Sequence, residues 1–166
     1  MEPPYQTETA MKASLPFTFA CALIFGLLSV PAPAEAKSAT SIPKADLVQP
    51  AELAASLKSA STPKPLLLHV GFHVLYTQAH IPGSEFVGPA SDEAGLKLLR
   101  DRVAKLPKDT AIVIYCGCCP WVDCPNMAAA YDELRALGFK QVKALYIADN
   151  FGTDWINKGY PVAKGG

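Results

Sequence analysis

Four cysteines gather in one short segment of the chain, where thiols can act together in redox, sulfur or metal chemistry. They lie within the nine residues of Cys116-Gly117-Cys118-Cys119-Pro120-Trp121-Val122-Asp123-Cys124. Cysteines that brace a small fold through disulfides are usually spread along the whole chain. This cluster therefore predicts a chemical site more than a structural framework.

Cys116 is the expected nucleophile of this loop. It directly follows an apolar run typical of a buried strand, and a helix is expected to begin at Pro125, where a missing backbone N–H does no harm. Backbone N–H groups of such a loop and the positive end of the helix favour a thiolate, so we expect a lowered pKa for Cys116. The anion-binding positions of the loop are expected to be Gly117, Trp121 and Cys124.

The additional cysteines allow further interpretations. Cys118 or Cys119 could resolve a persulfide on Cys116, and Cys116 with Cys119 has the Cys-x-x-Cys spacing of dithiol redox pairs. No cofactor is otherwise predicted, but four thiolates are soft ligands for Cu(I) or Zn(II). The candidate metal ligands are Cys116, Cys118, Cys119 and Cys124. Copper fits better than zinc, because adjacent residues of a short loop rarely both bind zinc. Alternatively, one disulfide among the last three cysteines braces the loop, or Cys116 is buried and inert.

Alternating strand and helix patterns surround the loop and are expected to position it. Apolar runs predict buried strands over 66–70, 111–115 and 142–147, with a short strand at 86–87. Apolar stripes predict helices over 50–57, 91–106, 125–137 and 154–158, whereas 71–78 has no clear pattern. The alternation predicts a single α/β domain with a mostly parallel central sheet flanked by helices. Ligand sites of such sheets lie beyond the carboxyl ends of the strands, where the cysteine loop is expected.

Residues 1–36 are predicted to be a signal peptide. Lys12 precedes the apolar stretch 17–30, and Ala34-Glu35-Ala36 has the small-x-small pattern of a cleavage site. Met11 fits the start of such a peptide better than the first residue does. Because the apolar stretch is short and ends in prolines, we expect a periplasmic or secreted protein without a stable membrane anchor.

The rest of the chain is predicted to be one domain over 50–164, preceded by a lead-in segment over 37–49. Lys and Arg total 15 and Asp and Glu total 15, so the formal net charge is zero. Such a balance gives no general attraction to nucleic acid or to anionic membranes, and neither is expected as a partner. Nothing in the sequence indicates an oligomeric state.

Four motifs, in order, resemble those of the rhodanese-like sulfurtransferase family. They are His80-Ile81-Pro82-Gly83, Ile114-Tyr115-Cys116 before the loop, Leu137-Gly138-Phe139 followed by Val142, and Trp155 with Gly159-Tyr160-Pro161-Val162. The resemblance runs from about residue 50 to residue 162. It implies transfer of sulfane sulfur through a persulfide on Cys116. It also implies a small sulfur-containing donor, and a thiol or a partner protein as the acceptor.

The loop departs from the pattern of this family. Eight residues separate Cys116 from Pro125 and none is basic, and His69-Val70-Gly71 stands where the family commonly has Asp-x-Arg. Family members hold the thiosulfate dianion partly with basic residues, so these departures argue against thiosulfate as the donor. A cysteine-dependent phosphatase is also excluded, because Val122 stands where that chemistry needs an arginine.

Several residues near the loop are expected to be structural. His69 is interpreted as a core histidine more than a ligand, and Trp121 as a cap packed over the loop. His80 is expected to fix its turn, and Asp123 and Asn126 to cap the following helix. The predicted function is an exported sulfurtransferase that handles a cysteine persulfide. The alternatives are a metal-binding module or a thiol–disulfide redox module on the same fold.

Overall fold

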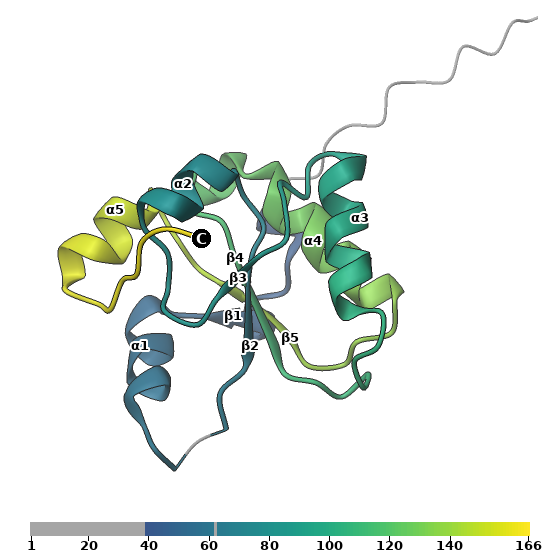
Figure 1. Ribbon diagram of the computed structural model, residues 1–166, viewed down its shortest axis with the longest axis horizontal. Helices are drawn as coiled ribbons and strands as arrows, with labels where there is room; N and C mark the ends of the chain where they lie inside the picture. Colours follow the sequence, from purple (N-terminus) through teal and green to yellow (C-terminus); the bar gives the residue numbers. More distant parts are fainter. Residues whose placement is uncertain (1–38, 62) are drawn as a thin grey trace, which may run out of the picture. The chain divides into compact units, whose positions relative to one another are not determined.

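The computed structural model describes residues 39–61 and 63–166, which form a central sheet with helices on both sides (Figure 1). The sheet has five parallel strands in the order β1-β5-β4-β2-β3. They are β1 (Leu47–Val48), β2 (Leu66–His69), β3 (Glu85–Phe86), β4 (Ile112–Tyr115) and β5 (Val142–Leu145). The cysteine loop starts from β4, the central strand.

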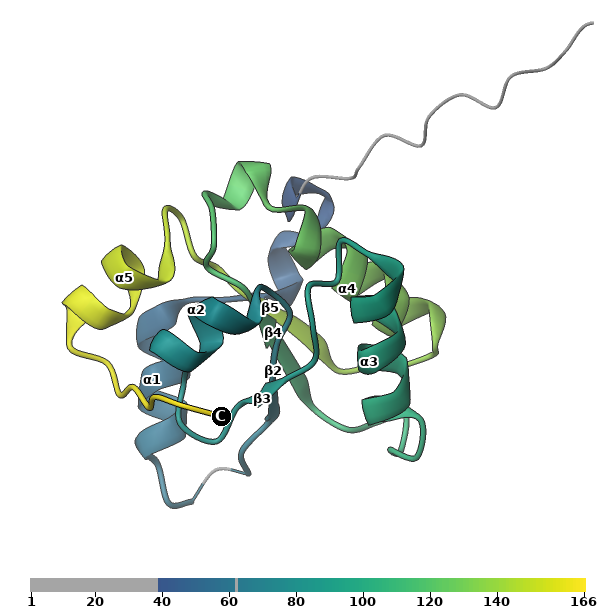
Figure 2. The same ribbon diagram turned by 45° about the horizontal axis from the view of Figure 1, so that its top comes forward.

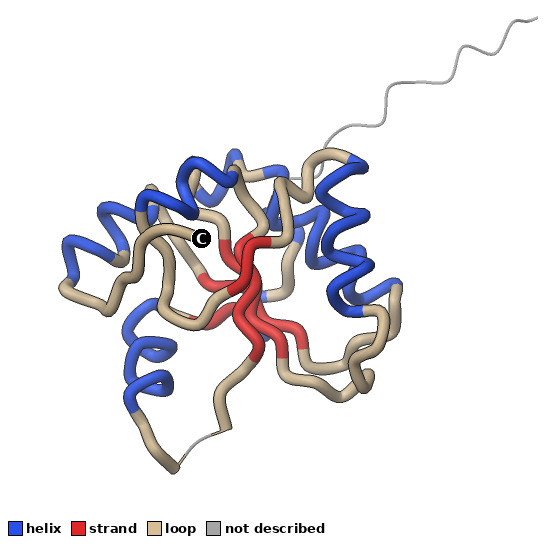
Figure 3. Tube along the Cα trace, viewed as in Figure 1, coloured by secondary structure: helices blue, strands red, loops and turns tan. Residues whose placement is uncertain are grey.

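Helices cover both faces of the sheet (Figures 2 and 3). On one side lie α1 (Pro50–Lys58) and α5 (Phe151–Asp154), and on the other lie α3 (Glu93–Val103) and α4 (Pro125–Ala136). The short helix α2 (His73–Gln78) follows β2 at the carboxyl edge of the sheet. Single 3-10 turns form at Ala39–Ser41, Lys44–Asp46, Trp121–Asp123 and Ile156–Lys158.

Alternate residues of the central strand point to opposite faces and build two cores. Ile112 and Ile114 join the core beneath α3 and α4, whereas Val113 and Tyr115 join the core beneath α1 and α5. Trp155 fills the second core and is completely buried. Strands covered on both faces have continuous apolar sequences, which is why the apolar runs predict them.

The predicted α/β architecture is confirmed, with a parallel sheet and flanking helices. The predicted strands, and the helices expected over 50–57 and 125–137, are present with ends shifted by no more than two residues. The segment 71–78, without a clear pattern, contains α2. The segment 37–49, expected as a lead-in, contributes β1, because Leu47 pairs with Ala144 of β5.

Two helices, α3 and α5, begin at other residues than predicted, because side chains cap their first turns. We expected a helix over 91–106, but α3 begins only at Glu93, because the Asp92 side chain accepts a hydrogen bond from the Gly95 N–H at 2.7 Å. The terminal helix was expected over 154–158. Instead α5 begins at Phe151, where the Asn150 side chain caps the first turn, and a 3-10 turn follows it.

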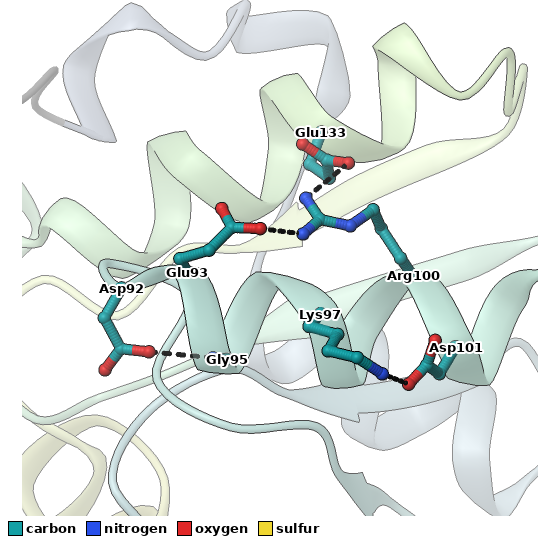
Figure 4. A network of polar contacts seen from close by, with 7 residues as sticks. All are labelled: Asp92, Glu93, Gly95, Lys97, Arg100, Asp101 and Glu133. Atoms are coloured by element: carbon teal, nitrogen blue, oxygen red, sulfur yellow. Dashed lines mark hydrogen bonds and ion pairs between the residues drawn. The ribbon is translucent and has the colours of Figure 1, made fainter.

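Polar contacts on the surface of α3 join it to α4 (Figure 4). Arg100 donates to Glu133 of α4 at 3.3 Å and also pairs with Glu93 of its own helix. Lys97 and Asp101 form an exposed pair at 2.5 Å. Exposed ion pairs contribute at most about 1 kcal/mol each, so the apolar core holds α3 against the sheet.

Tyr115, the last residue of β4, fixes the turn at 80–84. Its hydroxyl accepts a hydrogen bond from the Ile81 N–H at 3.1 Å and lies 2.7 Å from the Ser84 Oγ. His80 stacks on Tyr76 with ring centroids 4.0 Å apart, and its Nδ1 lies 2.8 Å from the Tyr76 carbonyl oxygen. These contacts agree with the structural role predicted for His80.

No helix among the described residues is long and apolar enough to cross a membrane. The predicted signal peptide, residues 1–36, lies outside the described residues. Export therefore stays a prediction from the sequence.

Candidate active site

The cysteine loop begins at the carboxyl edge of the sheet. Cys116 is the residue after β4, and the neighbouring strand β2 ends at His69, which pairs with Tyr115. The Val70 N–H donates to the Tyr115 carbonyl at 2.9 Å and extends this pairing by one residue. The start of the loop and the end of β2 thus lie side by side at one edge of the sheet.

Gly117 folds the chain back between the first two cysteines. Its φ of +80° lies in the left-handed region that favours glycine. A Cβ at this position would lie 2.7 Å from the Cβ of Phe151, whose N–H donates to the Gly117 carbonyl at 3.1 Å. With the backbone held in this way, the Sγ atoms of Cys116 and Cys118 lie 3.0 Å apart.

All four thiols of the loop are free, and their sulfur atoms form one cluster. The Sγ of Cys118 lies 3.2 Å from that of Cys119, and the Sγ atoms of Cys116, Cys118 and Cys124 all lie within 4.8 Å of one another. Cys116 is thus closest to Cys118. Its contact with this neighbour differs from the Cys-x-x-Cys pairing with Cys119 that the spacing suggested.

Hydrogen bonds between the sulfur atoms shift the pKa values of the four cysteines in opposite directions. Those from Cys116 and Cys124 lower the pKa of Cys118. Donation to Cys118 in turn raises the pKa of Cys116 to about 12, and the pKa values of Cys119 and Cys124 are raised as well. We expected a lowered pKa at Cys116, but its hydrogen bond to Cys118 raises this pKa, because one charge shared by the cluster suppresses ionisation of the surrounding thiols.

Asn126 connects the sulfur cluster to the rest of the fold. It is 1% exposed, and its Nδ2 donates to the Sγ of Cys116 at 3.6 Å and of Cys118 at 3.8 Å. Its Oδ1 accepts a hydrogen bond from the Ser91 N–H at 2.9 Å. The prediction that Asp123 and Asn126 cap α4 is wrong: the N-cap is residue 124, and no side chain caps this helix. Asn126 lies inside the first turn of the helix, where its amide reaches the cysteines.

His69 is buried, as expected of a core histidine, and it also lies against the cluster from the end of the neighbouring strand. It is 2% exposed, and a Cβ on Gly71 would lie 2.7 Å from the Cys116 Sγ and 3.1 Å from the His69 Cε1. The side chains of His69 and Cys116 therefore approach each other over Gly71, which has no side chain to separate them. Burial lowers the pKa of His69 to about 4, against a smaller opposing effect of Cys118, so the imidazole is neutral at pH 7. Its Nδ1 has no hydrogen-bond partner among the described residues.

A cavity of about 290 Å³ lies beside Cys116 and Cys118. His69 lines it from β2, and Phe151 and Ile156 line it from α5 and the turn that follows. None of its lining residues is a lysine, arginine, aspartate or glutamate. The cavity therefore suits a ligand of low charge better than a dianion, because its wall offers no opposite charge to replace the water that a dianion would lose.

Trp121 and Cys124 offer fewer backbone donors to an anion than the sequence suggested. The N–H groups of Trp121 and Cys124 already donate to backbone carbonyls, at 3.0 and 3.4 Å. The Trp121 side chain is 6% exposed and packs against Tyr146 with ring centroids 5.2 Å apart, so it caps the loop. The N–H of Cys118 does act on Cys116, whose pKa it lowers in opposition to the larger effect of the Cys118 side chain.

The family described as "Rhodanese-like domain" matches residues 49–147, which is more than half of the chain. The matched region includes the turn at 80–84, the cysteine loop and every strand except β1. A comparison with curated protein sequences finds no match.

Several solved structures share the fold at low sequence identity. A protein from Anabaena sp. is 22% identical with a TM-score of 0.54, over 70% of this chain and 82% of that chain. A protein from Bacillus halodurans is 21% identical with a TM-score of 0.54, over 70% and 75% of the two chains. A rhodanese-like domain protein from Staphylococcus aureus is 15% identical with a TM-score of 0.50, over 72% and 99%. These likenesses establish the fold.

Proposed function

Because this chain belongs to the rhodanese-like domain family, we propose that it is a sulfurtransferase that carries sulfane sulfur as a persulfide on Cys116. The family's fold supports a sulfurtransferase-type or related function in general. One observation carries the finer proposal. The Cys116 Sγ lies at the carboxyl end of the central strand, beside the cavity and 3.0 Å from the Cys118 Sγ.

The first step loads sulfur onto Cys116. Its Sγ attacks the outer sulfur of the donor, a new S–S bond forms on Cys116, and the donor's own S–S bond breaks. The electron pair of that bond leaves with the rest of the donor, as a thiolate if the donor is an organic persulfide. Cys116 must first lose its proton, which it shares with the Cys118 Sγ through the hydrogen bond between the two sulfur atoms at 3.0 Å.

The cavity favours an organic persulfide or a polysulfide as the donor. Its wall carries no lysine, arginine, aspartate or glutamate and includes the apolar side chains of Leu75, Phe151 and Ile156. Thiosulfate would need cationic partners to replace its water, and the lining supplies none. The acceptor is a small thiol or the thiol of a partner protein, and neither nucleic acid nor membrane takes part in this proposal.

The second step removes sulfur through Cys118. Once Cys116 carries a persulfide, the outer sulfur holds the proton and Cys118 is the thiolate. The Cys118 thiolate attacks the Cys116 Sγ, a disulfide between the two residues forms, the sulfur–sulfur bond of the persulfide breaks, and the outer sulfur leaves with the electron pair and the proton as hydrosulfide. A thiol reductant of the compartment then reduces the disulfide and becomes a disulfide itself. Attack on the outer sulfur instead moves the persulfide to Cys118, which is half-buried and therefore more accessible to an acceptor than the buried Cys116.

Intact-mass spectrometry of the reduced protein tests this proposal. We expect the wild type to gain one sulfur atom on incubation with cysteine persulfide, and to gain less with thiosulfate. The Cys116→Ser variant should gain none. The Cys118→Ser variant should gain sulfur and retain it longer, because it lacks the thiol that releases hydrosulfide.

The variants separate this proposal from its alternative. Sulfur gain by Cys116→Ser equal to that of the wild type would contradict the role of Cys116. A disulfide that forms on mixing with oxidised protein substrates, without any sulfur adduct in either variant, would favour thiol–disulfide exchange instead. In that case Cys118→Ser should block the exchange, since Cys118 is the neighbour in contact with Cys116.

Export is part of the same proposal, and its support is the sequence pattern over residues 1–36. A periplasmic or secreted location would expose the loop to an oxidising environment, where the reductant for Cys116 and Cys118 must be another exported protein or an exported thiol. N-terminal sequencing of the protein from cell fractions should find a mature chain that begins at Lys37. An unprocessed cytoplasmic chain would overturn this part alone.

A further inference from the structure

Three of the four loop cysteines form a set compact enough to share one ion. The Sγ atoms of Cys116, Cys118 and Cys124 all lie within 4.8 Å of one another. Two sulfur atoms bound to one ion at about 2.3 Å each can lie at most about 4.6 Å apart. The set is therefore near the required size before any ion binds, and Cys119 lies outside it.

The side chains around this set are buried from solvent and carry sulfur atoms. Cys116 and Cys124 are 3% and 2% exposed, and Met127 is 2% exposed. A void too small for a water molecule is bordered by these three side chains and by Cys119, but not by Cys118. Thioethers and thiolates are the ligands that monovalent copper prefers, and an ion held by Cys116, Cys118 and Cys124 would have this dry void on the side of Cys116 and Cys124.

We propose that Cys116, Cys118 and Cys124 bind one Cu(I) ion through their sulfur atoms. Structural zinc sites almost always need four ligands, whereas the group in the described residues offers three. Cys119 does not complete a zinc site easily, because it is the sequence neighbour of Cys118. Three sulfur ligands without a fourth fit Cu(I), which accepts low coordination and soft donors.

Copper at this site excludes the sulfur chemistry proposed above, because it occupies the Cys116 Sγ. The binding step displaces protons from the thiols that become thiolate ligands, with no change in the oxidation state of the metal or the protein. The proposal does not depend on sulfur transfer. A chain that never forms a persulfide could still bind the ion.

An anaerobic titration of the reduced full-length mature protein with Cu(I), in competition with a chromophoric Cu(I) chelator, tests the proposal. We expect one equivalent to bind, and X-ray absorption of the copper edge to show only sulfur neighbours. Cys124→Ser should weaken the affinity by at least roughly 100-fold, since even partners beyond the direct ligands contribute about 10–100-fold. The matched variant Cys119→Ser should keep the wild-type affinity.

Several results would overturn the copper site. They are no competition with the chelator, oxygen or nitrogen neighbours in the absorption spectrum, equal weakening by Cys119→Ser and Cys124→Ser, or displacement of bound Cu(I) by equimolar Zn(II). Thermal melts of the metal-free variants check that each one folds, and Cys116→Ser provides a second removal of a ligand. Sulfur gain measured on metal-free protein decides the sulfurtransferase proposal separately, so the two proposals can fail independently.

Discussion

Two segments that meet the chain at the end of β4, one at its last residue and one at the residue after it, are built from different kinds of contact. The hydroxyl of Tyr115 holds the turn at 80–84 through oxygen and nitrogen partners at 2.7 and 3.1 Å. Cys116, the next residue, opens a loop whose polar contacts run through sulfur atoms, at 3.0 Å to Cys118 and 3.6 Å to Asn126. The turn keeps the sequence motif of the family, whereas the loop departs from it.

From this difference we infer that the turn contributes mainly to the stability of the fold and the loop mainly to its chemistry. Hydroxyl and amide groups form directional hydrogen bonds that are costly to leave unmade when buried. Thiols are weak hydrogen-bond partners, but they ionise, form sulfur–sulfur bonds and bind soft metals. We therefore expect substitutions in the turn to change the free energy of unfolding, and substitutions of the loop sulfurs to change chemistry.

Gly117→Ala should be an exception to this separation of effects, because it should lower both the free energy of unfolding and the sulfur loading of Cys116. Alanine at a φ of +80° costs about 1–2 kcal/mol, and its Cβ would lie 2.7 Å from the Phe151 Cβ, a contact that costs about another 1–3 kcal/mol to relieve. We expect unfolding in urea to show a loss of about 2–5 kcal/mol, the sum of the two contributions. Sulfur loading from cysteine persulfide should also fall, since the backbone that sets the Cys116–Cys118 distance has to move.

Gly138→Ala is the matched control for this prediction. Its φ is +88°, but a Cβ there meets no atom within 4 Å. The control should therefore lose only the conformational part, about 1–2 kcal/mol, and keep normal sulfur loading. Equal losses of stability in the two variants would show that the contact with Phe151 does not hold the loop.

Much of the fold could be predicted from the sequence, because the patterns that define it are local. The apolar runs over 66–70 and 111–115 mark strands that are buried on both faces, and Pro125 marks the start of α4. Two helix ends were misplaced because their caps, Asp92 and Asn150, lie within polar segments that offer several candidates. A short helix such as α2 buries little and leaves a weak pattern.

The candidate site was only half predictable, because its remaining parts depend on distant segments. The four cysteines are visible in the sequence, yet their order of contact follows from the turn at Gly117 against Phe151. His69 reaches the loop only through the pairing of β2 with β4. The position of a histidine at the end of a strand suggests such an approach, since ligands bind at strand ends, but it does not fix the contact with Cys116 over Gly71.

His69 lies between the turn and the loop, and its protonation should make the free energy of unfolding depend on pH. Its ring is edge-on to that of Tyr115 at 5.0 Å, and it meets the Cys116 side chain at Gly71. Burial lowers its pKa from 6.5 to about 4, so between these values the unfolded chain binds a proton that the folded chain does not. Stability should therefore fall as pH drops from 6.5 to about 4, by about 3 kcal/mol from this group.

Urea unfolding of wild type and His69→Gln at pH 7 and pH 4.5 measures this contribution. Carboxylates also titrate in this range, so the quantity of interest is the difference between the two pH dependences. The variant should lose less stability on acidification than the wild type does. Identical pH dependences would mean that the imidazole takes up its proton in the folded state at an ordinary pKa.

Tyr115→Phe tests the turn with the smallest expected effect. The ring stays in the core, but the buried Ile81 N–H loses its acceptor and the Ser84 Oγ loses a partner. We expect a loss of about 1–2 kcal/mol in urea unfolding, with unchanged sulfur loading of Cys116. Ser84→Ala, which removes only one of the two bonds, should cost less. If Tyr115→Phe instead abolished sulfur loading at full stability, the turn would position the reactive loop, and the separation between the two segments would be wrong.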